Sequence, residues 1–276
     1  DVSGRLFAQK FHELWGQPVI VENVAGNSGA IGVDRVAKAA PDGYTLMWSG
    51  NAAITILPSL QKLPFDPVKD FAHISTTLVT GSVIMVNNDL PVKTLAELIA
   101  HAKANPGKLS YGSPGVGTPQ HIAGELLSKI TGIKMEHVPY RGAQMADTMS
   151  GVVPIAIQNA GASMPLIRDG RLRGLAITSL KRSGAAPDLP TVAEQGFPGF
   201  EAGSWFGFFA PKNTPRDVVL ALNKALNEAL TDKEIDARLV LDGADPKPGT
   251  PEEFGAFVKA EYQKWAEVVK ASGAKA

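Results

Sequence analysis

A glycine-rich loop, SPGVGTP (113–119), stands directly before a predicted helix over 119–131 and is the stretch best suited to bind a ligand. Main-chain N–H groups at the start of a helix have no partner within the helix and attract anions. The loop fits neither nucleotide-binding pattern, because a P-loop needs a lysine at Thr118 and a dinucleotide fingerprint needs a glycine at Gln120. Two alternatives remain, a site for a small anion or a purely structural turn.

The familiar catalytic patterns are missing from the sequence. It has no cysteine, no His-Glu-x-x-His motif and no Gly-x-Ser-x-Gly motif. The candidate nucleophilic serines have no base near them in the sequence, namely Ser28, Ser49, Ser113, Ser163 and Ser204. His121 and His137 are too far apart in sequence to indicate a shared metal, and His121 is either a packed side chain or one that reaches a ligand. We expect neither an enzyme nor a bound metal or cofactor.

Composition limits the classes of protein to consider. The 276 residues include 27 basic and 27 acidic side chains, so the chain lacks the basic excess that nucleic-acid binding requires. Hydrophobic residues make up 44% of the chain, but no apolar run approaches the roughly 18 residues of a membrane span. We therefore expect a soluble globular protein of one large domain or two lobes. The absence of cysteine suits an oxidising compartment such as the periplasm.

Short apolar runs alternate with amphipathic helices, a pattern typical of a largely parallel α/β sheet. Strands are predicted at 18–24, at the end of 41–50, and at 83–88, 108–113, 133–140, 153–160, 172–179 and 204–211. Helices are predicted at 1–16, 29–40, from 94, at 119–131, 142–151 and up to about 169, with three more after 211, the last at 251–271. Thr94 with Glu97, and Thr250, are expected to cap two of these helices, and 181–203 reads as an irregular connection.

Several predicted strands end in loops of small residues, at 49–53, 112–119, 140–144 and 158–163. Ligands of open α/β sheets bind beyond the carboxyl ends of strands, so we expect these loops to converge on one cleft. Tyr140 and Trp205 border that cleft and are either core aromatics or walls for the carbon skeleton of a ligand. Asp1 is either only a helix cap or a residue close to the cleft.

Eight segments carry a resemblance to a known family: GQPVIVENVAGNSGAIG (16–32), AAPDGYTL (39–46), LPFDPVKDF (63–71), PGKLSYGSPGVGTPQHIAGEL (106–126), HVPYRGA (137–143), RLRGLAITSLKR (171–182), PDLPTVAEQGFPGF (187–200) and WFGFFAPKNTP (205–215). In this order they resemble the substrate-binding receptors of tripartite tricarboxylate transporters, known as Bug proteins. The family has a first strand and a glycine-rich loop ahead of the residue that resembles Asp1, and an arginine where Val24 stands. We therefore expect a processed or truncated N-terminus, with part of the site outside this chain.

The resemblance implies a two-lobed α/β fold, the type II periplasmic-binding-protein fold, with the ligand cleft between the lobes. One lobe would hold 1–88 and 202–276 and the other 89–201, with hinges near 86–90 and 200–204. The implied protein is a monomeric periplasmic receptor that binds a small carboxylate, delivers it to inner-membrane transporter subunits and binds no nucleic acid. A ligand sensor for a signalling partner is the alternative, and an enzyme on the same fold is a more remote one.

The resemblance also implies which residues bind the ligand. Loop 113–119 becomes half of a carboxylate cradle, in which N–H groups at the helix start and the hydroxyls of Ser113 and Thr118 donate hydrogen bonds. The implied ligand-binding residues are Ser49, Asn51, Ala53, Ser113, Gly117, Thr118, His121, Tyr140, Gly142, Asn159, Ala160, Ser204 and Trp205, with Asp1 as a helix cap near the cleft.

Overall fold

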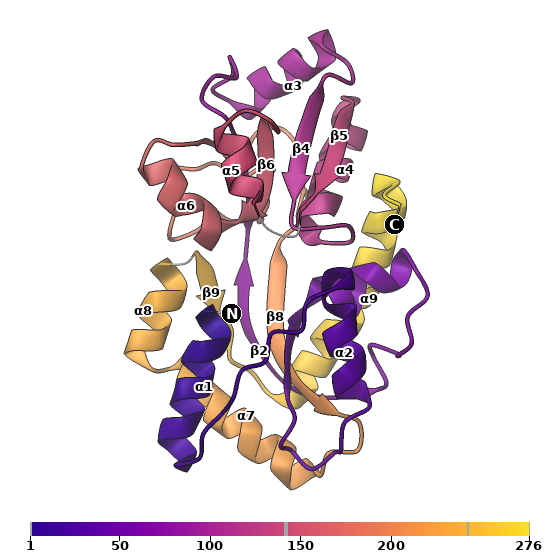
Figure 1. Cartoon of the computed structure of the whole chain (residues 1–276), viewed down its shortest axis with the longest axis vertical. Helices are drawn as coiled ribbons and strands as arrows, with labels where there is room; N and C mark the ends of the chain where they lie inside the picture. Colours follow the sequence, from indigo (N-terminus) through magenta and orange to yellow (C-terminus); the bar gives the residue numbers. More distant parts are fainter. Residues whose placement is uncertain (1, 141–142, 242, 276) are drawn as a thin grey trace. The chain divides into compact units, whose positions relative to one another are not determined.

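The computed structural model describes residues 2–140, 143–241 and 243–275, and the chain forms two compact units (Figure 1). Unit 1 comprises residues 1–79, 205–240 and 245–266. Unit 2 comprises residues 80–204, 241–244 and 267–276. The lobe limits and the hinges inferred from the sequence stay predictions.

Unit 1 is built on a four-stranded sheet with the strand order β1-β8-β2-β9. Its strands are β1 (Met47–Gly50), β2 (Phe71–Thr80), β8 (Ser204–Pro211) and β9 (Ala244–Pro246). Its helices are α1 (Val2–Trp15), α2 (Ala30–Ala37), α7 (Arg216–Leu230), α8 (Lys233–Leu241) and α9 (Pro251–Ser272), with helical turns at Asn27–Gly29, Ala52–Ile56 and Leu57–Ser59. The last residues of β2, α8 and α9 and the first residues of β8 and β9 belong to unit 2. Phe71, Trp205, Phe209 and Phe254 lie at the centre of its hydrophobic core.

Unit 2 is built on a five-stranded sheet with the strand order β5-β4-β6-β3-β7. Its strands are β3 (Ser82–Val86), β4 (Leu109–Ser113), β5 (Met135–Pro139), β6 (Ile155–Asn159) and β7 (Arg173–Ile177). Its helices are α3 (Leu95–Ala104), α4 (Pro119–Thr131), α5 (Gln144–Met149) and α6 (Ala160–Arg168). Helix α4 packs against β4, β5 and β6, so its N-terminus lies where β4 ends.

The prediction of a largely parallel sheet is wrong for several strand pairs. In unit 2, β3 pairs antiparallel with both β6 and β7, whereas β4 runs parallel to β5 and β6. In unit 1, β1 pairs antiparallel with β8, with Met47 opposite Phe209. The alternation of apolar runs and helices indicates α/β architecture but does not specify strand direction, because both directions use the same period of two.

The predicted buried strand at 18–24 is also wrong. These residues form no strand, and Ile20 is 81% exposed. The run has strand composition, but a strand also needs a neighbour to accept its backbone hydrogen bonds, and no described strand pairs with it.

Strands β2 and β9 were missed, and the reason is clearest for β2. Its sequence FAHISTTLVT places polar residues on buried positions. The Ser75 hydroxyl donates to the Gly249 C=O group at 3.1 Å, and the Thr77 hydroxyl donates to the Phe206 C=O group at 2.9 Å. Burial of these hydroxyls is possible because each has a partner, which the polarity of the sequence does not reveal.

The predicted helix caps are confirmed. The Thr94 hydroxyl accepts the N–H group of Glu97 at 3.1 Å, and the Glu97 carboxylate accepts the N–H group of Lys93 at 2.6 Å. Thr250 and Glu253 form a reciprocal capping box at the start of α9. Among the described residues, no helix is both long and apolar enough to cross a membrane.

Candidate functional site

Loop 113–119 joins β4 to α4 and holds its shape through its own hydrogen bonds. The backbone φ angle is 147° at Gly115 and 75° at Gly117, and residues with a side chain rarely adopt such values. The Thr118 hydroxyl donates to the Gly115 C=O group at 2.7 Å and accepts the His121 N–H group at 3.3 Å, which caps α4. The hydroxyl that the sequence analysis assigned to a ligand is therefore engaged within the loop.

Ser113 is also engaged within the loop. Its side chain is fully buried, and its hydroxyl donates to the Gly115 C=O group at 3.2 Å. The Nε2 atom of His137, from β5, lies 2.6 Å from the Ser113 oxygen. The N–H group of Gly115 donates to the same serine oxygen at 3.2 Å. Among the described residues, no carboxylate contacts the His137 ring.

The rings of His121 and His137 stack beneath the loop, with centroids 4.0 Å apart and planes 19° apart. The N–H group of Gly117 donates to Nδ1 of His121 at 3.2 Å. Burial lowers the pKa of His121 to about 4, and burial together with the neighbouring His121 ring lowers the pKa of His137 to about 3. Both rings are thus neutral at pH 7. Within the described ranges, no group of three or more potential ligands could hold a metal ion.

A second polar cluster lies within unit 2 and joins α4 to the start of β3, the end of β6 and Ser204. The Nε2 group of Gln120 donates to the side-chain oxygens of Ser82 at 2.9 Å and Asn159 at 2.6 Å. The Ser204 hydroxyl donates to the same Asn159 oxygen at 3.1 Å. The N–H group of Ala160 donates to the Gly81 C=O group at 3.1 Å. The predicted residues Asn159 and Ser204 are therefore brought together by Gln120, which the sequence analysis did not select.

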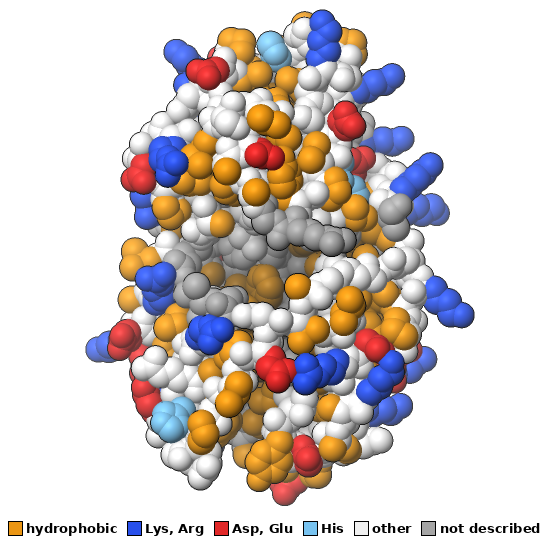
Figure 2. Space-filling view, viewed as in Figure 1, with side chains coloured by type: hydrophobic (Ala, Val, Ile, Leu, Met, Phe, Trp, Pro, Cys, Tyr) orange, Lys and Arg blue, Asp and Glu red, His pale blue; other side chains and the backbone are white. Residues whose placement is uncertain are grey.

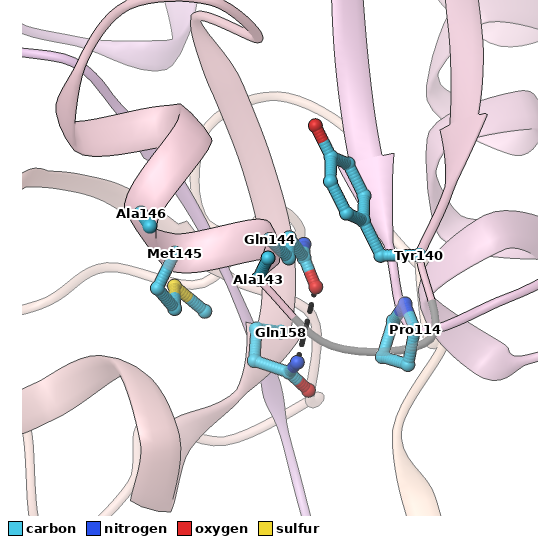
Figure 3. A pocket seen from close by; sticks show the side chains of 7 residues that line it. All are labelled: Pro114, Tyr140, Ala143, Gln144, Met145, Ala146 and Gln158. Carbon is cyan, nitrogen blue, oxygen red and sulfur yellow. Dashed lines mark hydrogen bonds between the residues drawn. The ribbon is translucent and has the colours of Figure 1, made fainter.

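A pocket of about 370 Å³ lies beside loop 113–119 in unit 2 (Figure 3). It is lined by Pro114, Tyr140, Ala143, Gln144, Met145, Ala146 and Gln158. Of the residues that the sequence analysis named one by one, only Tyr140 is among them. Gln144 and Gln158 were missed as individuals, although both belong to the small-residue loops at 140–144 and 158–163. The signal was their place near strand ends, since Gln158 is the next-to-last residue of β6 and Gln144 begins α5 shortly after β5.

The described walls of the pocket are uncharged. Tyr140 donates its hydroxyl proton to the Asp147 carboxylate at 2.7 Å, and burial together with this carboxylate raises the pKa of Tyr140 to about 12. None of the described lining residues carries a charge. Over the face drawn in Figure 2, side chains of both signs are interspersed on the surface.

The predicted residues of unit 1 have a different environment. Asn51 is 2% exposed and Ala53 1% exposed, and Ser49 is half-buried at the end of β1. Trp205 is 2% exposed, with its ring edge-to-face against Phe254 at 6.0 Å. Its Nε1–H group is buried and has no hydrogen-bond partner in the described part of the chain.

Two predicted residues, Asp1 and Gly142, lie outside the described residues. The expectation that loops from both lobes line one cleft stays a prediction, as do the ligand roles of the residues placed above.

Comparison with known proteins gives the site its context. Residues 4–274 match the family described as tripartite tricarboxylate transporter family receptor. The chain is 38% identical over 282 residues to Protein BugT of Bordetella pertussis, covering all of this chain and 86% of BugT. Among solved structures, it is similar to R. palustris Rpa4515 with adipate, at 34% identity and a TM-score of 0.95 over 100% of this chain and 93% of Rpa4515. It is also similar to the periplasmic binding protein BugD, at 34% identity and a TM-score of 0.91 over 99% of this chain and 93% of BugD.

These similarities extend over nearly the whole chain and confirm the resemblance seen in the sequence, together with the α/β fold of periplasmic binding proteins. The chain belongs to the receptor family of the tripartite tricarboxylate transporters.

Proposed function

We propose that this protein is a periplasmic receptor that binds a small carboxylate as its anion and releases it unchanged to a membrane transporter. The observation that carries the proposal is the pocket of about 370 Å³ beside loop 113–119, the loop that leads into α4, whose described lining residues carry no charge. A pocket of this size suits a small organic molecule. The start of a helix stabilises negative charge, and the described lining residues include no carboxylate to repel an anion.

The relatives support the same ligand class. Rpa4515, which is similar over the whole of this chain, is described with adipate, a dicarboxylate. Membership of a transporter receptor family supports delivery to transporter subunits in the inner membrane, and the likeness to BugD supports a periplasmic location.

Binding without catalysis fits the geometry of the one serine–histidine contact at the site. The Ser113 hydroxyl is fully buried, and its proton is donated to a C=O group of its own loop. A nucleophile must be exposed to its substrate, and Ser113 is not. Mass spectrometry of each acid recovered after incubation with the protein should show it chemically unchanged.

The proposal is tested by comparing carboxylic acids with their methyl esters in thermal unfolding experiments. A ligand at about 100 times its Kd stabilises the fold by about 2.7 kcal/mol, which raises the Tm by several degrees. An ester loses the charge and one acceptor oxygen, which leaves donors of the site unpaired at a cost of about 1–3 kcal/mol. Some acids of a mono-, di- and tricarboxylate panel should raise the Tm more than their esters do. An ester that equals its acid, or a neutral sugar with the largest shift, would contradict the proposal.

A role in transport is distinguished from a role in sensing by deleting the gene. Loss of growth on an acid that binds, with transporter expression unchanged, supports delivery to the transporter. Loss of transporter expression with normal uptake after forced expression supports a sensor.

A further inference from the structure

Gln144 holds a fixed orientation at the base of the pocket. Its side chain is 4% exposed, and its Nε2 group donates to the C=O groups of Gly112 at 2.8 Å and Ile157 at 3.2 Å. Both acceptors are main-chain oxygens, which only accept, so the two amide hydrogens of Gln144 must face them. The Oε1 atom of Gln144 is therefore left to face Gln158, as Figure 3 shows.

Gln144 in turn fixes the orientation of the Gln158 side-chain amide. The Nε2 group of Gln158 donates to Oε1 of Gln144 at 3.1 Å, and its Oε1 atom accepts the main-chain N–H group of Asn159 at 2.9 Å. Main-chain groups thus fix both ends of the pair, and neither amide can be turned over without breaking hydrogen bonds. A primary amide nitrogen has two hydrogens, so one Nε2 hydrogen of Gln158 remains, and no described residue accepts it.

The rest of the pocket wall leaves this hydrogen as the notable free polar group. Met145, Ala143 and Ala146 contribute apolar side chains, and Tyr140 has donated its proton to Asp147. A lone donor among apolar surfaces fits an acceptor oxygen at the end of a carbon chain, because a hydrocarbon end would leave the donor unpaired. Pro114 places loop 113–119 on the same pocket.

We propose that Gln158 is a specificity-determining residue that donates to the second carboxylate of a dicarboxylate, and that Gln144 is the residue that positions it. This inference rests on the proposed function, in which the other carboxylate of the ligand is held at the start of α4. Gln158 then selects diacids over monoacids of the same chain length. Gln144 contributes to that selection only through the orientation of Gln158.

The test compares adipate with hexanoate, which differ by a methyl group in place of one carboxylate, using isothermal titration calorimetry. The wild-type protein should bind adipate more tightly than hexanoate. Gln158→Met keeps the length of the side chain and removes the donor, so it should weaken adipate binding by about tenfold or more. Hexanoate binding should change less than about twofold, since hexanoate has no oxygen for this donor to reach.

The positioning role of Gln144 is tested with Gln144→Met and a matched control, Gln195→Met. Gln195 also donates from Nε2 to main-chain oxygens of unit 2, those of Leu175 and Thr191, but does not line the pocket. Gln144→Met should narrow the preference for adipate over hexanoate, and Gln195→Met should leave it unchanged. In ¹⁵N-resolved NMR spectra, the side-chain amide hydrogens of Gln158 should exchange faster with water in Gln144→Met. Thermal unfolding and hexanoate binding report whether each variant folds.

Each outcome decides the inference. If Gln158→Met binds adipate as tightly as the wild type, Gln158 is not the donor, while adipate binding still supports a carboxylate receptor. If the wild type binds hexanoate as tightly as adipate, or binds neither acid, selection by Gln158 is wrong. The proposed function is then judged separately by the panel of acids and esters. If Gln144→Met leaves both the preference and the exchange rates unchanged, the positioning role is wrong.

Discussion

The residues selected from the sequence fall into two regions with opposite character. In unit 1, Ala53 and Trp205 lie within a hydrophobic core beside Phe209 and Phe254. In unit 2, the loop that precedes α4 is surrounded by hydrogen-bonded hydroxyls, amides and stacked imidazoles. Both regions contain the end of a strand and a run of small residues, so the sequence pattern is alike while the surroundings differ.

The difference teaches what small residues at a strand end can mean. In unit 1 they permit close packing, because a Cβ atom at Gly50 would collide with the Trp205 C=O oxygen. In unit 2 the glycines allow main-chain N–H and C=O groups to turn toward side-chain partners. Chemical selectivity requires oriented polar groups, so the structure favours unit 2 as the region that discriminates between ligands.

The largest expected effect concerns the core of unit 1. Trp205→Ala should lower the free energy of unfolding by about 3–5 kcal/mol, because it removes a buried aromatic ring and leaves a cavity. Trp205→Phe should cost only about 1 kcal/mol, since it keeps most of the apolar contacts and removes an unpaired N–H group. Urea denaturation followed by circular dichroism measures both values.

The same two variants test whether Trp205 in unit 1 serves only in packing. If Trp205→Phe keeps its stability but binds adipate about tenfold more weakly than the wild type, the indole N–H group is a ligand donor. Unit 1 would then contribute chemistry as well as packing. Unchanged adipate binding in Trp205→Phe supports the assignment of Trp205 to the core.

The second effect is a pH dependence that arises in unit 2. Burial lowers the pKa of His121 from 6.5 to about 4, so the unfolded chain binds more protons than the folded chain between these pH values. The stabilisation is complete above pH 6.5 and is lost as the pH falls toward 4. For His121 alone the loss is about 3 kcal/mol.

A substitution at His121 isolates this contribution from that of the carboxyl groups. Asparagine places its Oδ1 atom close to the position of Nδ1 and can still accept the Gly117 N–H group, but it does not titrate. Urea denaturation at pH 7, 5.5 and 4.5 should therefore show a steeper loss of stability in the wild type than in His121→Asn. If the free energy of unfolding falls equally with pH in the wild type and in His121→Asn, protonation of His121 does not contribute to the loss of stability.

Features with a period or a local cap could be predicted from the sequence. The helix caps at Thr94 and Thr250 follow from residues three positions apart, and β8 has the predicted bounds of 204–211. The buried strand β2 could not be predicted from polarity, because its hydroxyls are satisfied by residues more than a hundred positions away. A local sequence pattern predicts hydrogen bonds between residues close in sequence, but not those between residues far apart in sequence.

The candidate site shows the same limit. The loop at 113–119 and the small-residue stretches could be found from the sequence, as could their place after strands. The contact between Ser113 and His137 and the orientation of Gln158 by Gln144 depend on how β4, β5 and β6 lie side by side. Strand order sets these contacts, and no local pattern in the sequence specifies strand order.

The smallest expected change in the free energy of unfolding comes from removing a helix cap. Unit 2 offers two caps for comparison, one at the pocket and one away from it. Thr118 caps α4 beside the pocket, and Thr94 caps α3, which contributes no residue to the pocket lining. Thr118→Ala and Thr94→Ala should each lower the free energy of unfolding by about 1 kcal/mol, because each leaves an N–H group of the first turn without its side-chain partner.

Thr118→Ala should also weaken adipate binding, since the Gly115 C=O group loses its donor and the loop loses its fixed shape. Thr118→Ser restores the hydroxyl and should restore binding, while Thr94→Ala should bind adipate as the wild type does. Equal adipate affinities in Thr118→Ala and Thr94→Ala, measured by calorimetry, would show that the internal hydrogen bonds of the loop stabilise α4 without shaping the ligand site.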